Sequence, residues 1–103
     1  MKNKKVFTVY IGENDIYEWS MNEGKDVLMP QIFKGVKKVY SKELDEIHVA
    51  RVETSIRGQK KAFDFWVKDD EIEDTIDKLM EWSLESENYE LCSEIKKLID
   101  SAK

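Results

Sequence analysis

The chain has 103 residues, of which 41% are hydrophobic and 38% charged, and its formal net charge is −5. This length suits one domain with its own core, which we expect to span 1–103. The single cysteine, Cys92, excludes an internal disulfide, and no apolar run approaches the roughly 18 residues that a membrane span needs. Because no secretory leader pattern opens the sequence, we expect a cytoplasmic protein.

The charge is unevenly divided along the chain. Residues 1–68 contain 13 Lys and Arg against 10 Asp and Glu, whereas residues 69–103 contain 4 against 12. The acidic part disfavours phosphate binding, which leaves a lysine group in the first part as the possible nucleic-acid surface. This group comprises Lys34, Lys37, Lys38 and Lys42. Lysine outnumbers arginine 15 to 2, which argues against sequence-specific recognition, because arginine is better suited to bidentate contacts.

The first elements are predicted as two strands. β-Branched and aromatic residues over 5–11, apolar on both faces, predict a central strand. Polar turn residues follow, and alternation over 16–21 predicts a second strand and a first hairpin. A short helix over 16–21, capped by Asn14 or Asp15, is the alternative.

A helical period follows over 26–40, where apolar residues recur at three- and four-residue spacing. Asp26 is the expected N-cap, which places Pro30 in the first turn, where a missing N–H costs least. Gly35 in the interior lowers the helix propensity. The pattern nevertheless predicts one helix that ends near Tyr40.

A second hairpin is predicted by strands over 47–56 and 61–67 around a turn at Arg57 and Gly58. With Ile56 opposite Gln59, one face becomes apolar and the other receives a charge pair. On the apolar face this register pairs Val52 with Phe63, Ala50 with Phe65 and His48 with Val67, and on the other face Arg51 with Asp64.

The region 69–103 is predicted to form two antiparallel helices. Asp69 or Asp70 is the expected cap, and acidic residues in the first turn favour a helix start. The first apolar stripe comprises Ile72, Ile76, Leu79, Met80 and Ser83. After a polar break at 85–88, the second comprises Leu91, Cys92, Ile95, Leu98, Ile99 and Ala102. The short connection predicts facing stripes, which the sheet is expected to help cover.

No catalytic constellation is present. We interpret His48, the only histidine, as a strand residue at the edge of the apolar face, and Cys92 as a small apolar residue. The acidic run over 69–77 lacks the glycine and ligand spacing of a calcium loop, and the four glycines are scattered. We therefore expect no enzyme activity, no metal site and no cofactor.

The helical pair carries a family resemblance over 76–99. Its residues are Ile76, Met80, Ser83, Asn88-Tyr89-Glu90, Cys92-Ser93, Ile95 and Ile99. On these positions 76–99 resembles the UVR motif, the helical hairpin of the excision-repair proteins UvrB and UvrC and of regulators of the bacterial Clp protease. Lys96 and Lys97 stand where that family has Arg-Asp. The resemblance implies a protein-interaction element that pairs with a related hairpin or a partner subunit.

The sequence thus predicts an α+β fold with a four-stranded, mainly antiparallel sheet in the order ββαββαα and a C-terminal helical hairpin. Our hypothesis is a small non-enzymatic adaptor or regulatory protein that contacts a protein partner or a second copy through its acidic hairpin. The candidate contact residues are Trp82, Leu84, Tyr89, Glu90, Lys96 and Lys97. For Trp82, at the margin of the first stripe, a position at the edge of the core is favoured over a partner contact. The alternative function is a nucleic-acid-binding or nucleic-acid-mimicking accessory protein of a bacterium or phage.

Overall fold

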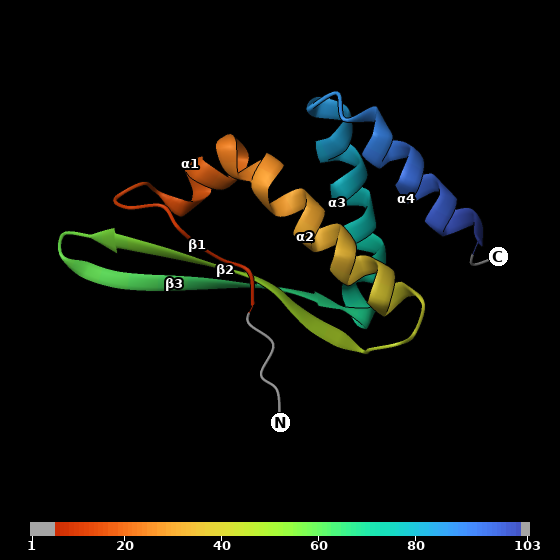
Figure 1. The fold of residues 1–103 in the computed structure, drawn as a ribbon, viewed down its shortest axis with the longest axis horizontal. Coiled ribbons are helices and arrows are strands. Elements are labelled where there is room, and N and C mark those ends of the chain that lie inside the picture. The colour runs from red at the N-terminus through yellow and green to blue at the C-terminus, as the bar shows by residue number, and fades with distance from the viewer. Residues whose placement is uncertain (1–5, 102–103) are drawn as a thin grey trace.

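The computed structural model describes residues 6–101, which form a three-stranded mixed sheet and four α-helices (Figure 1). In chain order the elements are β1 (Thr8–Tyr10), α1 (Ile16–Met21), α2 (Glu23–Tyr40), β2 (Glu46–Ile56), β3 (Gln59–Lys68), a 3₁₀ turn (Asp69–Glu71), α3 (Ile72–Glu85) and α4 (Tyr89–Ser101). The α+β class and the C-terminal helical pair are confirmed, and the fourth strand is wrong. Among the described helices, none combines the length and the apolar character needed to cross a membrane.

Helix α1 replaces the predicted second strand. The carboxylate Oδ1 of Asp15 accepts hydrogen bonds from the backbone N–H groups of Tyr17 and Glu18, at 2.7 and 3.2 Å. These bonds satisfy two donors that a helix start leaves free, so the cap favours the helix over the strand. Only Trp19 is buried on α1, and the alternating apolar residues around it do not share a sheet face.

Strand β1 lies at the edge of the sheet, with β2 in the centre. It runs parallel to β2 and places Thr8 opposite Arg51 and Tyr10 opposite Glu53. A parallel pair needs a long crossover, which α1 and α2 supply. The predicted central, antiparallel strand over 5–11 is therefore corrected to a short parallel edge strand; Lys5 lies outside the described residues.

The β2–β3 hairpin is confirmed over most of its length. Its turn residues Arg57 and Gly58 have φ angles of 53° and 78°, as a type I′ turn requires. The pairs Ile56–Gln59, Val52–Phe63, Ala50–Phe65 and Arg51–Asp64 have the predicted register. Figure 1 shows the turn end of this hairpin projecting well beyond the helices.

A β-bulge at Val49 changes the register at the other end. His48 lies opposite Trp66, and Ile47 lies opposite Val67, so the predicted pair of His48 with Val67 is wrong. Val49 and Ala50, which follow each other in the chain, are both buried. The extra residue thereby keeps the apolar face continuous and turns His48 to the opposite face.

Helix α2 covers one face of the sheet. It begins at Glu23, one residue after Asn22, whose side chain makes no capping hydrogen bond, so the predicted start at Asp26 is wrong and Pro30 lies in the helix interior. Its buried side chains include Leu28, Met29, Phe33, Val36 and Val39. Gly35 lies so close to the sheet that an added Cβ would clash with Cγ1 of Val49.

The C-terminal helices form a second helical layer beside α2. Helix α3 packs on α2 and on the end of β3, and α4 packs chiefly on α3 (Figure 1). Neither Asp69 nor Asp70 caps α3: a 3₁₀ turn precedes it, and Glu71 at the N-cap position makes no side-chain capping bond. Within residues 72–99 both predicted stripes face inward, but α2 rather than the sheet covers most of the α3 stripe, and α3 covers most of the α4 stripe; Ala102 is outside the described residues.

We expect Gly35→Ala to lower the free energy of unfolding by about 1–3 kcal/mol, because the new methyl group must displace Val49. The clash outweighs the gain of about 1 kcal/mol that alanine brings to a helix. Urea unfolding followed by circular dichroism measures the change. Lys34→Ala, on the exposed side of the same helix, serves as control and is expected to stay within about 0.5 kcal/mol. Equal stability of Gly35→Ala and wild type would contradict the close packing.

Candidate protein-interaction surfaces

An apolar groove of about 300 Å³ lies between β3 and α3. Its apolar lining comes from three elements and comprises Ile32 of α2, Phe65 and Trp66 of β3, and Leu79 and Trp82 of α3. The rim of the groove is formed by Glu71, Asp74, Thr75 and Lys78. Aromatic and aliphatic lining with charged groups at the border is the usual composition of a ligand or peptide site.

Two of the predicted contact residues on α3 lie on different flanks of the helix. The side chain of Trp82 is half-buried and lines the groove beside β3. Leu84 is 54% exposed and, two residues further on, lies about 200° around the helix from Trp82. The structure therefore places Trp82 in contact with the core and Leu84 away from it.

The four predicted contact residues of α4 are all exposed and form two pairs. Tyr89, which is 64% exposed, lies seven residues before Lys96, and Glu90 lies seven residues before Lys97. Seven residues are two helical turns, so each pair shares a flank of α4. Glu90 also borders a shallow pocket between α2 and α4. Together with Leu84, Tyr89 gives the loop end of the helical hairpin two large exposed apolar side chains.

The four predicted nucleic-acid-binding lysines are only partly together. Lys34, Lys37 and Lys38 lie within about one turn of α2, but Lys34 and Lys38 border a pocket with Ile47 and His48 of β2. Lys37 is exposed, and its Nζ is 5.0 Å from the centre of the Phe33 ring. Lys42 follows α2, and its Nζ lies 2.8 Å from Oδ1 of Asp69. The hydrogen bond to this carboxylate and its negative charge raise the pKa of Lys42. Asp69 thus offsets one of the four charges.

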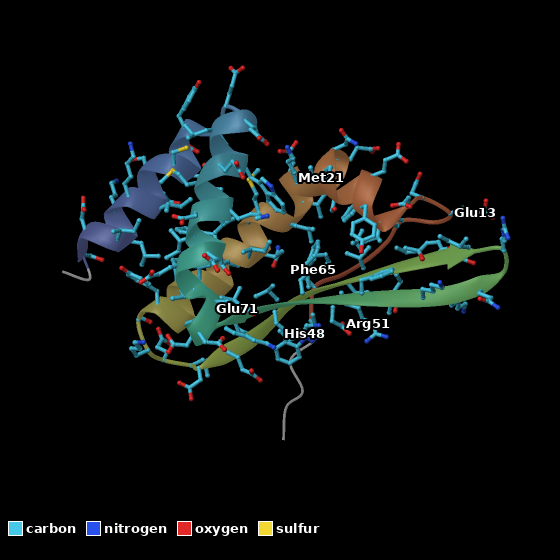
Figure 2. All side chains as sticks on the ribbon, turned by 180° about the vertical axis from the view of Figure 1, so that it is seen from behind. Glu13, Met21, His48, Arg51, Phe65 and Glu71 are labelled. Atoms are coloured by element: carbon cyan, nitrogen blue, oxygen red, sulfur yellow. The ribbon has the colours of Figure 1, made fainter. Side chains whose placement is uncertain are left out.

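The face of the sheet opposite α2 carries a polar cluster that the sequence reasoning missed. The imidazole of His48 stacks on Trp66 with ring centres 4.7 Å apart, and its Nε2 lies 2.8 Å from Oδ1 of Asp64. The guanidinium of Arg51 reaches the same carboxylate at 3.7 Å. Figure 2 shows His48 and Arg51 on one side of the strands and Phe65 on the other. Alternation along β3 already implied that Trp66 faces away from Phe65.

Cys92 lies in the interface between α3 and α4. Its Sγ is 2.8 Å from Oγ of Ser83, and this hydroxyl also donates a hydrogen bond to the carbonyl of Met80. Both Ser83 and Cys92 are buried, in agreement with the predicted packing role of the thiol. Within residues 6–101 no group of three or more His, Cys, Asp or Glu side chains is arranged to hold a metal ion.

We expect Trp82→Ala to lower the free energy of unfolding by about 2–4 kcal/mol, because the ring packs between α3 and the core. Leu84→Ala on the opposite flank is the matched control, and its effect is expected within about 0.5 kcal/mol. Thermal and urea unfolding of both variants measure the difference. If Leu84→Ala were the more destabilising of the two, the assignment of the flanks would be wrong.

Comparison with known proteins adds no family to this description. No protein-family model, no curated protein and no solved structure matches the chain. The resemblance of 76–99 to the UVR motif therefore stays a prediction from the residues that carry it.

Proposed function

We propose that the protein is a small non-enzymatic adaptor or regulator that acts through protein contacts of its C-terminal helical hairpin. The observation that carries the proposal is the exposure of Leu84 and Tyr89 at the loop between α3 and α4, 54% and 64% respectively. The inward stripes of both helices already pack against the rest of the fold. Leu84 and Tyr89 are apolar side chains that this packing leaves exposed. Aromatic side chains are enriched at the centre of protein interfaces.

The negative charge around Leu84 and Tyr89 favours a partner with a positively charged contact surface. Glu85 ends α3, where its carboxylate lies 2.7 Å from Lys25 Nζ, Glu87 lies in the loop, and Glu90 follows on α4. The region 69–103 carries 12 acidic residues against 4 basic ones. A partner with an apolar pocket bordered by lysine or arginine fits this surface, because opposite potentials favour encounter and register. Lys96 lies two helical turns after Tyr89 on the same flank of α4, and it provides a cation at the border of the contact.

The alternative, nucleic-acid binding, is supported by Lys34, Lys37 and Lys38, which lie within about one turn of α2. Lys34 and Lys37, however, border the same shallow pocket as Glu90 and Glu94 of α4. Acidic side chains close to the lysines reduce the positive potential that phosphate binding needs. In a further variant of this alternative, the acidic hairpin itself mimics nucleic acid and occupies a DNA-binding partner.

We expect the double variant Leu84→Gln with Tyr89→Gln to lose its partner. Affinity capture from a lysate of the source cells, followed by mass spectrometry, is expected to recover at least one protein with the wild type and to lose it, by about tenfold or more, with the variant. The substitutions remove apolar contact area without adding charge, and neither side chain is buried.

The control is the double variant Tyr17→Gln with Met21→Gln on α1, whose side chains are 78% and 58% exposed. It removes a comparable apolar area from another part of the surface and should keep the partner. Loss of the partner with the α1 variant alone would place the contact surface on α1 and refute the role of the hairpin.

For the nucleic-acid alternative, we expect no binding of mixed single- and double-stranded oligonucleotides at 150 mM salt in fluorescence anisotropy. Phosphate binding that depends on Lys34, Lys37 and Lys38 would instead strengthen steeply as salt is lowered and disappear on their replacement by glutamine. Tight binding that is abolished by this triple variant would establish the alternative in place of the adaptor.

A further inference from the structure

Strand β3 exposes one complete edge of the sheet. Its backbone donors and acceptors alternate between β2 and the outside. Just beyond the two strands, the N–H of Asp69 donates to the carbonyl of Asp45 at 2.8 Å, which fixes which residues of β3 face β2. The alternate residues of β3 therefore direct their backbone groups outward: these are Lys60, Ala62, Asp64, Trp66 and Lys68. Within the described residues, the strand order ends at β3, and no other strand covers this edge.

The charges along this edge are separated by sign. Lys60 and Lys61 lie at the turn end of β3, and Asp69, Asp70 and Glu71 follow its other end. Charged edges usually oppose pairing with another sheet. Here an antiparallel copy of the same edge brings the lysine end of one chain to the acidic end of the other, so that charge favours the pair instead.

We propose that two copies of this chain pair antiparallel along their β3 edges, with a two-fold axis at Phe65, to form one six-stranded sheet. In this register Asp64 of each copy hydrogen-bonds with Trp66 of the other, and Ala62 with Lys68. On the helix-facing side, Phe65 meets Phe65 and Phe63 meets Val67. A two-fold interface of this kind uses the same surface on both chains and closes as a dimer.

Two neighbouring registers are less favourable. A two-fold axis at Asp64 would place Asp64 opposite its own copy and Lys60 opposite Lys68, and like charges directly opposite each other are destabilising. An axis at Phe63 would place Lys61 opposite Phe65 on the apolar side. In contrast to these two registers, the axis at Phe65 combines apolar pairs on the helix side with Lys60 opposite Asp70 and Lys61 opposite Asp69.

The groove beside β3 is chemically matched to this occupant. Phe65 and Trp82 line it, and Glu71 and Asp74 stand at its rim. An extended segment that enters it should carry aromatic residues on one side and basic residues near Glu71. The chain's own segment 60–65, Lys-Lys-Ala-Phe-Asp-Phe, has this composition. The inference goes beyond the proposed function, because Leu84 lies on the other flank of α3 from this groove.

The first test uses charge reversal and sedimentation equilibrium of the full chain. Wild type is expected to sediment as a dimer, and both Lys60→Glu with Lys61→Glu and Asp70→Lys with Glu71→Lys are expected to weaken it at least about tenfold. An equimolar mixture of the two variants restores opposite charges at both ends of the heterodimer, so we expect it to dimerise again. All four residues are exposed and none is in an ion pair among the described residues.

A monomeric wild type at 1 mM would overturn the proposal, as would a dimer whose affinity neither variant changes. Circular dichroism of each variant establishes that a lost dimer is not a lost fold. Failure of the mixture to dimerise, with both variants folded, would contradict the antiparallel arrangement. These readouts are independent of partner capture through Leu84 and Tyr89, so either proposal can fail alone.

The second test fixes the register by cross-linking. Ala62→Cys with Lys68→Cys is expected to form an intermolecular disulfide under mild oxidation, because the proposed register places these positions directly opposite each other at a distance that a disulfide can bridge. Ala62→Cys alone is the control and should stay uncross-linked, since position 62 does not face itself. The native Cys92 is buried and remains in place. Cross-linking of the single variant in preference to the double one would refute the axis at Phe65.

Discussion

The contact between α2 and β2 at Gly35 is the constraint on which the rest of the fold depends. Since Gly35 has no side chain, the helix lies directly on Val49, Ile47 and Val67. The bulge at Val49 serves the same contact, because it keeps two successive β2 residues on the helix side. With α2 fixed in this way, its other flank offers Phe33 and its neighbours to the C-terminal helices, which makes α2 the element that joins the sheet to the hairpin.

The parts of the fold that depend on local periodicity could be predicted from the sequence. The register that pairs Arg51 with Asp64 follows from a two-residue period and a two-residue turn, and α3 and α4 follow from their apolar stripes. The helix over 16–21 could not be separated from a strand, because six residues fit both periods and the capping carboxylate of Asp15 decides between them. The bulge was hidden for a related reason: Val49 and its neighbour Ala50 are both apolar, so the pattern does not show which is the extra residue.

The candidate surfaces were predictable only where they belong to one helix. The exposure of Leu84 and Tyr89 is a property of the hairpin alone, and the sequence identified both residues. The groove beside β3 is different, because Ile32, Phe65 and Trp82 come from three elements far apart in the chain. No spacing rule joins such residues, and only the packing of α3 against β3 and α2 creates the site.

The position of α4 also affects how the protein opens. This helix packs chiefly on α3 rather than on the sheet, and it ends the described chain. Detaching it exposes Leu91, Ile95 and the Cys92 thiol while β2, β3 and α2 keep their contacts with one another. Local opening has a lower free energy than global unfolding where fewer apolar contacts are lost. The amide protons of α4 therefore exchange with solvent sooner than those of β2, and the thiol of Cys92 becomes accessible through the same partly open state.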